Sequence, residues 1–154
     1  MDLAPDFNEF IGSLTAHDVE FVVVGAYALA FHGAPRFTGD LDILVRPTRE
    51  NGARLLAAVA AFGFPIPELR AEDIAGGGKI LQMGLEPVQI HVMSALSGVD
   101  WNEVWAGREI GPCGQHLVAF IGRDAFVKNK RASGRLKDLA DIEALRGGAE
   151  GETR

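Results

Sequence analysis

The spacing of apolar residues alternates between a helical and a strand period along the chain. Residues 6–17 carry apolar side chains at helical spacing and predict a first helix. The β-branched and aromatic run 19–24 predicts a buried strand that ends at Gly25. The stretch 26–31 is rich in Ala and Leu, so we expect a short helix to begin at the glycine.

The rest of the chain continues this mixture of helices and strands. Further strands are predicted at 41–45 (led by Asp40), 79–85, 88–93, 109–113 and 116–120, and further helices at 49–62, 101–106, 123–132 and 134–146. Residues 71–78 end in a run of glycines and predict a mobile loop. The order of elements favours an α/β (α+β-like) domain with a mixed β-sheet and helices packed mainly on one side. We expect one domain over residues 1–146 and a disordered tail over 147–154.

The composition is that of a globular domain. The chain has 154 residues, of which 47% are hydrophobic and 23% are charged. No apolar run reaches the about 18–20 residues of a membrane helix, and the N-terminus lacks the layout of a signal peptide. Cys113 is the single cysteine, which excludes an internal disulfide, so we expect a cytoplasmic location and no membrane partner.

The charge is spread unevenly along the chain. The net charge of −6 argues against extended nucleic-acid binding. Residues 1–100 hold 6 basic and 13 acidic side chains, whereas residues 101–154 hold 9 basic and 8 acidic ones. Five of these basic side chains fall close together, at Lys128, Lys130, Arg131, Arg135 and Lys137. Such a cluster is either a solvated helix face or an anion site, depending on what it faces.

Two acidic residues, Asp40 and Asp42, flank Leu41 on a predicted strand. Because strand side chains alternate between faces, both carboxylates point the same way, about 6–7 Å apart. Two like charges at this spacing repel unless a cation lies between them, and hard oxygen ligands suit Mg²⁺ or Mn²⁺. The alternative is an acidic pair on an edge strand that faces water.

A glycine turn precedes this pair. Gly25 ends one predicted strand and begins a helix. Backbone N–H groups at the start of a helix can bind a phosphate, and a glycine lets the phosphate approach closely. Each feature alone is common, but the turn and the acidic pair together would place a triphosphate beside metal ions.

This combination resembles the DNA polymerase β-like nucleotidyltransferases. The resemblance rests on a glycine and a small residue after a strand, a short helix, and Asp-x-Asp on the next strand, in residues 22–45 (VVVGAYALAFHGAPRFTGDLDILV). It extends to residues 97–101 (SGVDW) and 130–142 (KRASGRLKDLADI). The chain looks like the minimal members of that family, which include nucleotidyltransferase toxins of abortive-infection toxin–antitoxin systems. The resemblance implies a nucleotidyltransferase fold and a nucleoside triphosphate substrate.

The resemblance also implies roles for three residues in catalysis. In that family two strand carboxylates hold two metal ions, and a third carboxylate on a later strand helps to bind one of them. Asp40 and Asp42 match the first two. His91 stands at the third position, with the uncharged Gln89 on the same face. The site could use Mn²⁺ or another softer ion, His91 could be a general base, or catalysis could be degraded. A histidine that only makes a hydrogen bond within the sheet is the remaining alternative.

The nucleotide-binding residues that the resemblance implies are Gly25, Ala26, Arg36, Thr38, Lys130 and Lys137. Ala26 lacks the hydroxyl of relatives that have serine there, although backbone contacts would survive. Arg36 either contacts a phosphate or forms a surface ion pair. The two lysines would neutralise the triphosphate. Asp138 and Asp141 share a helix face and either orient these lysines or stabilise the start of the helix.

Two hypotheses about function follow from the resemblance. In the first, the chain is an enzyme that transfers a nucleoside monophosphate from an NTP bound to Mg²⁺ or Mn²⁺ to a hydroxyl acceptor on a small molecule, a protein or an RNA, with release of pyrophosphate. In the second, it is a catalytically impaired relative that binds a nucleotide or a protein partner, for example in a toxin–antitoxin pair. His91 is the residue that discriminates between the two. A metal-dependent hydrolase is disfavoured, since the chain lacks paired histidines at metal-binding spacing.

Overall fold

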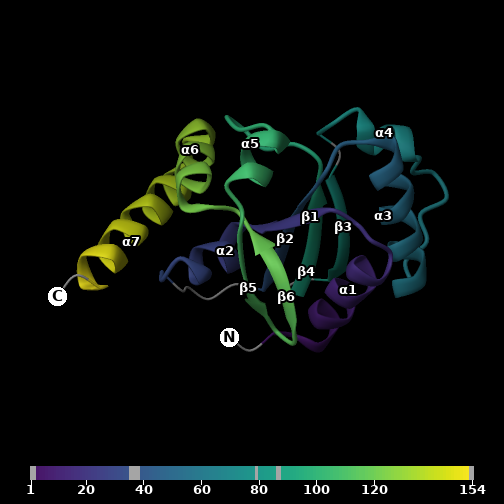
Figure 1. Ribbon diagram of the computed structural model, residues 1–154, viewed down its shortest axis with the longest axis horizontal. Helices are drawn as coiled ribbons and strands as arrows, with labels where there is room; N and C mark the ends of the chain where they lie inside the picture. Colours follow the sequence, from purple (N-terminus) through teal and green to yellow (C-terminus); the bar gives the residue numbers. More distant parts are fainter. Residues whose placement is uncertain (1–2, 35–38, 79, 86–87, 153–154) are drawn as a thin grey trace.

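A computed structural model describes residues 3–34, 39–78, 80–85 and 88–152 of the chain (Figure 1). The predicted phosphate-binding residues Arg36 and Thr38 lie outside these described residues. Within the described ranges, no helix combines the length and the apolar character needed to cross a membrane.

The described residues form helices and strands in mixed order along the chain. In sequence they are α1 (Pro5–Ala16), β1 (Phe21–Val24), α2 (Gly25–Phe31), β2 (Asp40–Val45), α3 (Arg49–Phe62), α4 (Ala71–Ala75), β3 (Ile80–Leu85), β4 (Val88–Met93), α5 (Trp101–Ala106), β5 (Glu109–Cys113), β6 (His116–Phe120), α6 (Arg123–Ser133) and α7 (Leu136–Glu152). The bounds of α3, β4, α5, β5 and β6 agree with the predicted ranges.

One predicted loop is partly helical. Residues 71–75 of the expected mobile loop 71–78 form α4. The backbone N–H of Arg70 donates to the Asp73 carboxylate at 3.0 Å, and the Ile74 side chain is buried. A hydrogen bond at the start of the helix and one apolar anchor therefore stabilise a single turn that sequence periodicity could not reveal.

The predicted disordered tail also differs from the structure. Helix α7 continues to Glu152, past the predicted helix end at residue 146, so residues 147–152 are helical. No proline after residue 146 removes a backbone donor, and the alanine and two glutamates of this segment offset in part its three glycines, which have a low helix propensity. The assignment of residues 1–146 to a single domain stays a prediction.

The six strands form one mixed sheet with the order β3-β4-β2-β1-β6-β5. β1 is antiparallel to β2 and parallel to β6, β2 is parallel to β4, and the edge strands β3 and β5 pair antiparallel with β4 and β6. This confirms the predicted mixed sheet. It also places β2, the strand that carries the two aspartates, in the interior of the sheet.

One face of the sheet is apolar, and the other carries the two aspartates of β2. Leu41 and Ile43 of β2 are fully buried, and Ile90 of β4 lies beside Leu41 in the strand register. Phe7 of α1 and Phe62 of α3 line a small hollow together with Ile90, so α1 and α3 cover this apolar face (Figure 1). Because side chains alternate along a strand, the two aspartates of β2 lie on the opposite face.

A buried amide connects β2, which carries these aspartates, to the neighbouring strand β1. The Asn51 side chain is 1% exposed and accepts a hydrogen bond from the Glu20 N–H at 2.8 Å. Its Nδ2 donates to the carbonyl oxygens of Glu20 at 3.0 Å and Arg46 at 3.1 Å. Glu20 precedes β1 and Arg46 follows β2, so Asn51 of α3 fixes one strand against the other.

Candidate functional site

One cleft of about 480 Å³ gathers most of the predicted site residues. It lies where β1 ends and β2 begins, beside β4, and residues of α6 and α7 form its other wall. The predicted residues that line it are Gly25, Ala26, Asp40, Asp42, His91, Lys130 and Lys137. Residues from five separate elements thus meet in one place.

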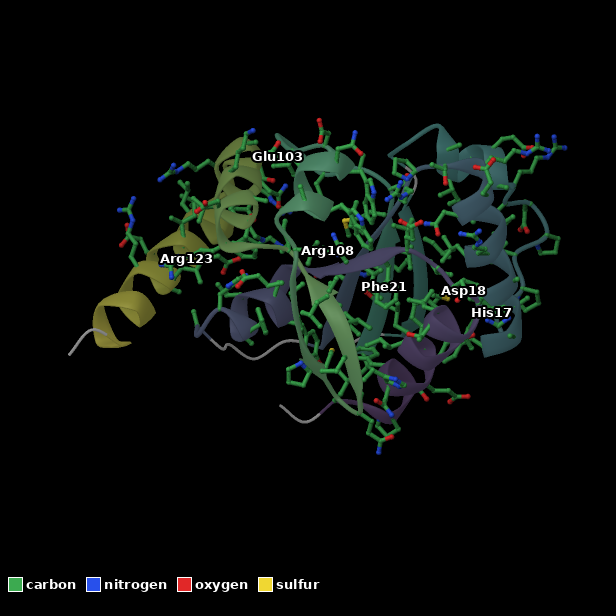
Figure 2. All side chains as sticks on the ribbon, viewed as in Figure 1. His17, Asp18, Phe21, Glu103, Arg108 and Arg123 are labelled. Atoms are coloured by element: carbon green, nitrogen blue, oxygen red, sulfur yellow. The ribbon has the colours of Figure 1, made fainter. Side chains whose placement is uncertain are left out.

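Two other hollows on the surface lack this combination. One, of about 300 Å³, lies beside Glu103 and Arg123, and another, of about 430 Å³, lies beside Asp18, Phe21 and Arg108 (Figure 2). Each of them is lined by a single basic residue. The 480 Å³ cleft brings two carboxylates of one strand together with three basic side chains, so we take it as the candidate site.

Asp40 and Asp42 both face this cleft from β2. Because β2 is an interior strand, the expectation that the pair could lie on an edge strand is wrong. Burial raises the pKa of Asp42, and the charge of Asp40 raises it further, whereas the contact with His91 and the charge of Lys130 offset part of the rise. Ionisation of Asp42 is therefore less favourable here than in water, and a bound cation would relieve that cost.

His91 lies directly across from Asp42. In the parallel register of β2 and β4, His91 pairs with Asp42 and Gln89 pairs with Asp40. The His91 Nδ1 is 3.0 Å from the Asp42 Oδ1, and the His91 Nε2 is 3.2 Å from the Gln89 Oε1. An ionised carboxylate can only accept a hydrogen bond, so Nδ1 carries the proton in the first contact. In this arrangement the ring holds Asp42 and does not offer Nδ1 to a cation.

Gly25 begins α2 in the left-handed region, with φ of +66°. A Cβ atom at this position would collide with the carboxylate of Asp42. Val24, the preceding residue, pairs with Asp42 across the antiparallel strands. A glycine is therefore required here for the backbone conformation and for the space that Asp42 occupies.

Lys130 is held by two aspartates of α7. It is 9% exposed, and its Nζ lies 3.3 Å from a carboxylate oxygen of both Asp138 and Asp141. Asp138 is 0% and Asp141 4% exposed, so the contact joins α6 to α7 through buried charges. The contacts of Asp138 fit both alternatives, because it pairs with Lys130 and its Oδ2 also accepts the Arg135 backbone N–H at 3.3 Å at the start of α7.

Arg135 was not among the predicted site residues. It lines the cleft, and its Nε donates to the Asp138 Oδ2 at 2.7 Å while the side chain stays 62% exposed. Lys137 is also exposed and lines the same cleft. Among the described residues, these two are the basic side chains of the cleft that solvent reaches readily. The i, i+3 spacing of Arg135 and Asp138 is the sequence signal that could have indicated the first of them.

Comparison with solved structures bears on the fold. A crystal structure from Thermotoga maritima, described as that of a putative nucleotidyltransferase, matches with a TM-score of 0.58 over 94% of this chain and 91% of that chain. The chain has a nucleotidyltransferase-like fold. The two sequences are 12% identical, so this likeness concerns the fold alone, and any chemistry has to be argued from the cleft. No protein-family model and no curated protein matches the sequence.

Proposed function

We propose that this protein transfers a nucleoside monophosphate from a metal-bound nucleoside triphosphate to a hydroxyl acceptor and releases pyrophosphate. The observation that carries the proposal is the meeting of Asp40 and Asp42 with Arg135 and Lys137 in one cleft. Carboxylates suit the cation of a metal–nucleotide complex, and the basic side chains suit its phosphates. The cleft volume of about 480 Å³ lies within the range of small-molecule sites.

The donor set fits a cation that is bound together with the nucleotide. Among the residues that the structure describes, no group of three or more His, Cys, Asp and Glu side chains could hold a metal ion alone. Mg²⁺ is commonly bound by one or two carboxylates and by substrate phosphates, and Asp40 and Asp42 provide the protein's part of that set. When bound, Mg²⁺ or Mn²⁺ supplies positive charge next to the phosphoryl group that is transferred.

The reaction needs an attacking oxygen, a proton acceptor and a leaving group. The acceptor hydroxyl oxygen forms a bond to the α-phosphorus, the bond from that phosphorus to the bridging oxygen breaks, and pyrophosphate leaves. The hydroxyl proton passes to a base. With Nδ1 donating to Asp42, a neutral His91 has its Nε2 as the nitrogen that would accept this proton, and the new Nε2–H would then donate to the Gln89 Oε1, which lies 3.2 Å away. This arrangement supports His91 as the general base rather than as a metal ligand through Nδ1.

The basic side chains and the glycine turn would position the triphosphate. Arg135 and Lys137 present exposed cations to the cleft, and Gly25 and Ala26 line it with little side-chain bulk. Lys130 would act through its charge at the cleft wall, since its Nζ is already bound by Asp138 and Asp141. Roles for Arg36 and Thr38 stay predictions.

The test is binding of a fluorescent NTP in the presence of Mn²⁺, followed by label transfer from an NTP labelled at the α-phosphate. Asp40→Asn and Asp42→Asn should each abolish metal-dependent binding and leave the fold intact. Asp18→Asn is the matched control, because Asp18 is exposed at φ 55°, which asparagine tolerates, and lies outside the cleft. Unchanged binding in both cleft variants would refute the proposal.

A catalytically impaired nucleotide-binding module is the second candidate. The observation that favours it is the neutral pair Gln89 and His91 opposite the two carboxylates, which leaves the cleft without a third acid among the described residues. His91→Asp should then gain Mg²⁺-dependent label transfer. If His91 is the working base, the same variant should lose activity. A role in a toxin–antitoxin pair stays a prediction.

A further inference from the structure

We propose that the cleft binds one divalent cation together with the nucleotide, not two, because His91 engages one of the two Asp42 oxygens. This inference rests on the proposed function and specifies its metal site. It concerns the number of cations, which the contacts of Asp42 restrict.

A pair of catalytic cations lies only about 3.5–4 Å apart, so the two ions need a ligand that can reach both. A carboxylate does so by giving one oxygen to each ion. The Asp42 Oδ1 accepts a hydrogen bond from the His91 Nδ1 at 3.0 Å, which occupies one of its lone pairs and favours the Oδ2 as the oxygen for a cation. The Oδ2 is the atom nearest to the position of a Cβ at Gly25, so the available oxygen lies beside the glycine turn.

The His91 ring is held in this orientation from both sides. Its Nε2 contacts the Gln89 Oε1 at 3.2 Å, and its backbone belongs to β4, which lies between β3 and β2 inside the sheet. The side chain is 25% exposed. A ring that donates through Nδ1 and lies against Gln89 at Nε2 keeps one lone pair of the Asp42 Oδ1 occupied.

The charge of the side chains in the cleft also indicates a single cation. The strand face offers Asp40 and Asp42 as carboxylates, and their cross-strand neighbours Gln89 and His91 carry no negative charge to share with a second ion. The opposite wall of the cleft carries basic side chains. One divalent cation balances the two strand carboxylates, whereas a second would have to be held almost entirely by the nucleotide.

The experiment counts Mn²⁺ per bound nucleotide. The protein is titrated with Mn²⁺ and a non-hydrolysable NTP analogue, free Mn²⁺ is measured by electron paramagnetic resonance, and crystals of the complex locate the ions by anomalous scattering. We expect one Mn²⁺ per bound nucleotide in the wild type. Two Mn²⁺ would overturn the single-cation inference while the proposed function survives. Absence of metal-dependent nucleotide binding would instead refute the proposed function.

Two variants test the role of His91. His91→Asp should raise the count to two, since an aspartate adds a carboxylate and releases the Asp42 Oδ1. His91→Asn stays neutral but lacks the imidazole, so it tests the hydrogen bond without adding a carboxylate. A count above one in this variant would support the role of the bond to the Asp42 Oδ1, whereas a count of one would overturn that role. A count of one in a folded His91→Asp protein would overturn the role given to His91. Thermal melting checks the fold of both variants, and the wild-type count decides the inference if His91→Asp does not fold.

Discussion

The carboxylate of Asp42 lies in the space that a side chain on Gly25 would need. Asp42 belongs to β2 and pairs with Val24, the last residue of the antiparallel strand β1, and Gly25 follows Val24 as the first residue of α2. The glycine turn and the acidic strand are therefore parts of one packing arrangement. A side chain added at Gly25 should therefore displace the carboxylate of Asp42.

Gly25→Ala should lower stability and nucleotide affinity together. The left-handed backbone at φ +66° costs a non-glycine residue about 1–2 kcal/mol, and the added methyl group would displace the Asp42 carboxylate. We expect a lower melting temperature and a loss of Mn²⁺-dependent NTP binding of at least about tenfold, equal to about 1.4 kcal/mol. Differential scanning fluorimetry and a fluorescent NTP titration measure the two effects.

Gly77→Ala is the control for backbone strain. Gly77 has φ of +78°, but nothing lies within 4 Å of its added Cβ. This variant should lose a comparable amount of stability from the backbone alone and keep nucleotide affinity. Equal nucleotide affinity in the two variants would mean that the contact between residue 25 and Asp42 does not matter for binding.

Lys130→Ala should act mainly on stability. Its Nζ is the cation that joins the buried carboxylates of Asp138 and Asp141. Removing one partner of a buried ion pair commonly costs about 3–5 kcal/mol, and we expect the loss here to lie at or below the lower end of this range, because Arg135 still pairs with Asp138. Urea unfolding at neutral pH measures this loss. A change below about 1 kcal/mol would contradict the structural role given to Lys130.

Lys137→Ala should weaken nucleotide binding and leave stability almost unchanged. Lys137 lines the cleft and is exposed, so its removal should change stability by no more than about 0.5 kcal/mol. Loss of one exposed cation should weaken NTP binding about threefold to tenfold, and the difference should shrink at high salt. Isothermal titration at two salt concentrations tests this, with Lys128→Ala as the control, because Lys128 does not line the cleft.

The sequence pattern was sufficient for much of the fold and for the acidic pair. Alternation along residues 40–45 required Asp40 and Asp42 to share a face, and the structure has them so. Strand periodicity also placed Gln89 and His91 on one face. These are consequences of local backbone geometry, which a single sequence reveals.

The contacts between side chains of the site could not be predicted from the periodicity of the sequence. The bond between His91 and Asp42 depends on β4 lying parallel beside β2, which is a matter of strand order and register. The burial of Lys130 depends on how α7 packs on α6. The sequence pattern showed a cluster of basic residues but did not show that Lys130 is buried against two carboxylates.

Asn51→Ala should destabilise the protein without touching the cleft. Its amide is 1% exposed and satisfies the Glu20 N–H and two backbone carbonyl oxygens. Leaving buried backbone groups without partners costs about 1–3 kcal/mol. We expect a loss in that range by urea unfolding. Asn102→Ala, at an exposed position of α5, should stay within about 0.5 kcal/mol of the wild type.

The buried charges between α6 and α7 should give part of the stability a definite dependence on pH. Burial tends to raise the pKa of Asp138, but hydrogen bonds from Arg135 and Lys130 and their charges outweigh it, so the pKa lies below its usual value. In the unfolded chain the same carboxyl has an ordinary pKa of about 3.9. Between these two values the unfolded state binds more protons than the folded state, so stability falls as the pH falls.

Asp138→Asn should therefore show its largest effect above the ordinary pKa of aspartate. At neutral pH we expect a loss of about 3 kcal/mol, as for a broken buried ion pair. The difference between wild type and variant should shrink as the pH falls through the lowered pKa of Asp138, because protonation then removes the same charge from the wild type. Urea unfolding at a series of pH values measures this difference directly. A difference that grows on acidification would show that Asp138 does not stabilise the fold as an ionised partner of Lys130 and Arg135.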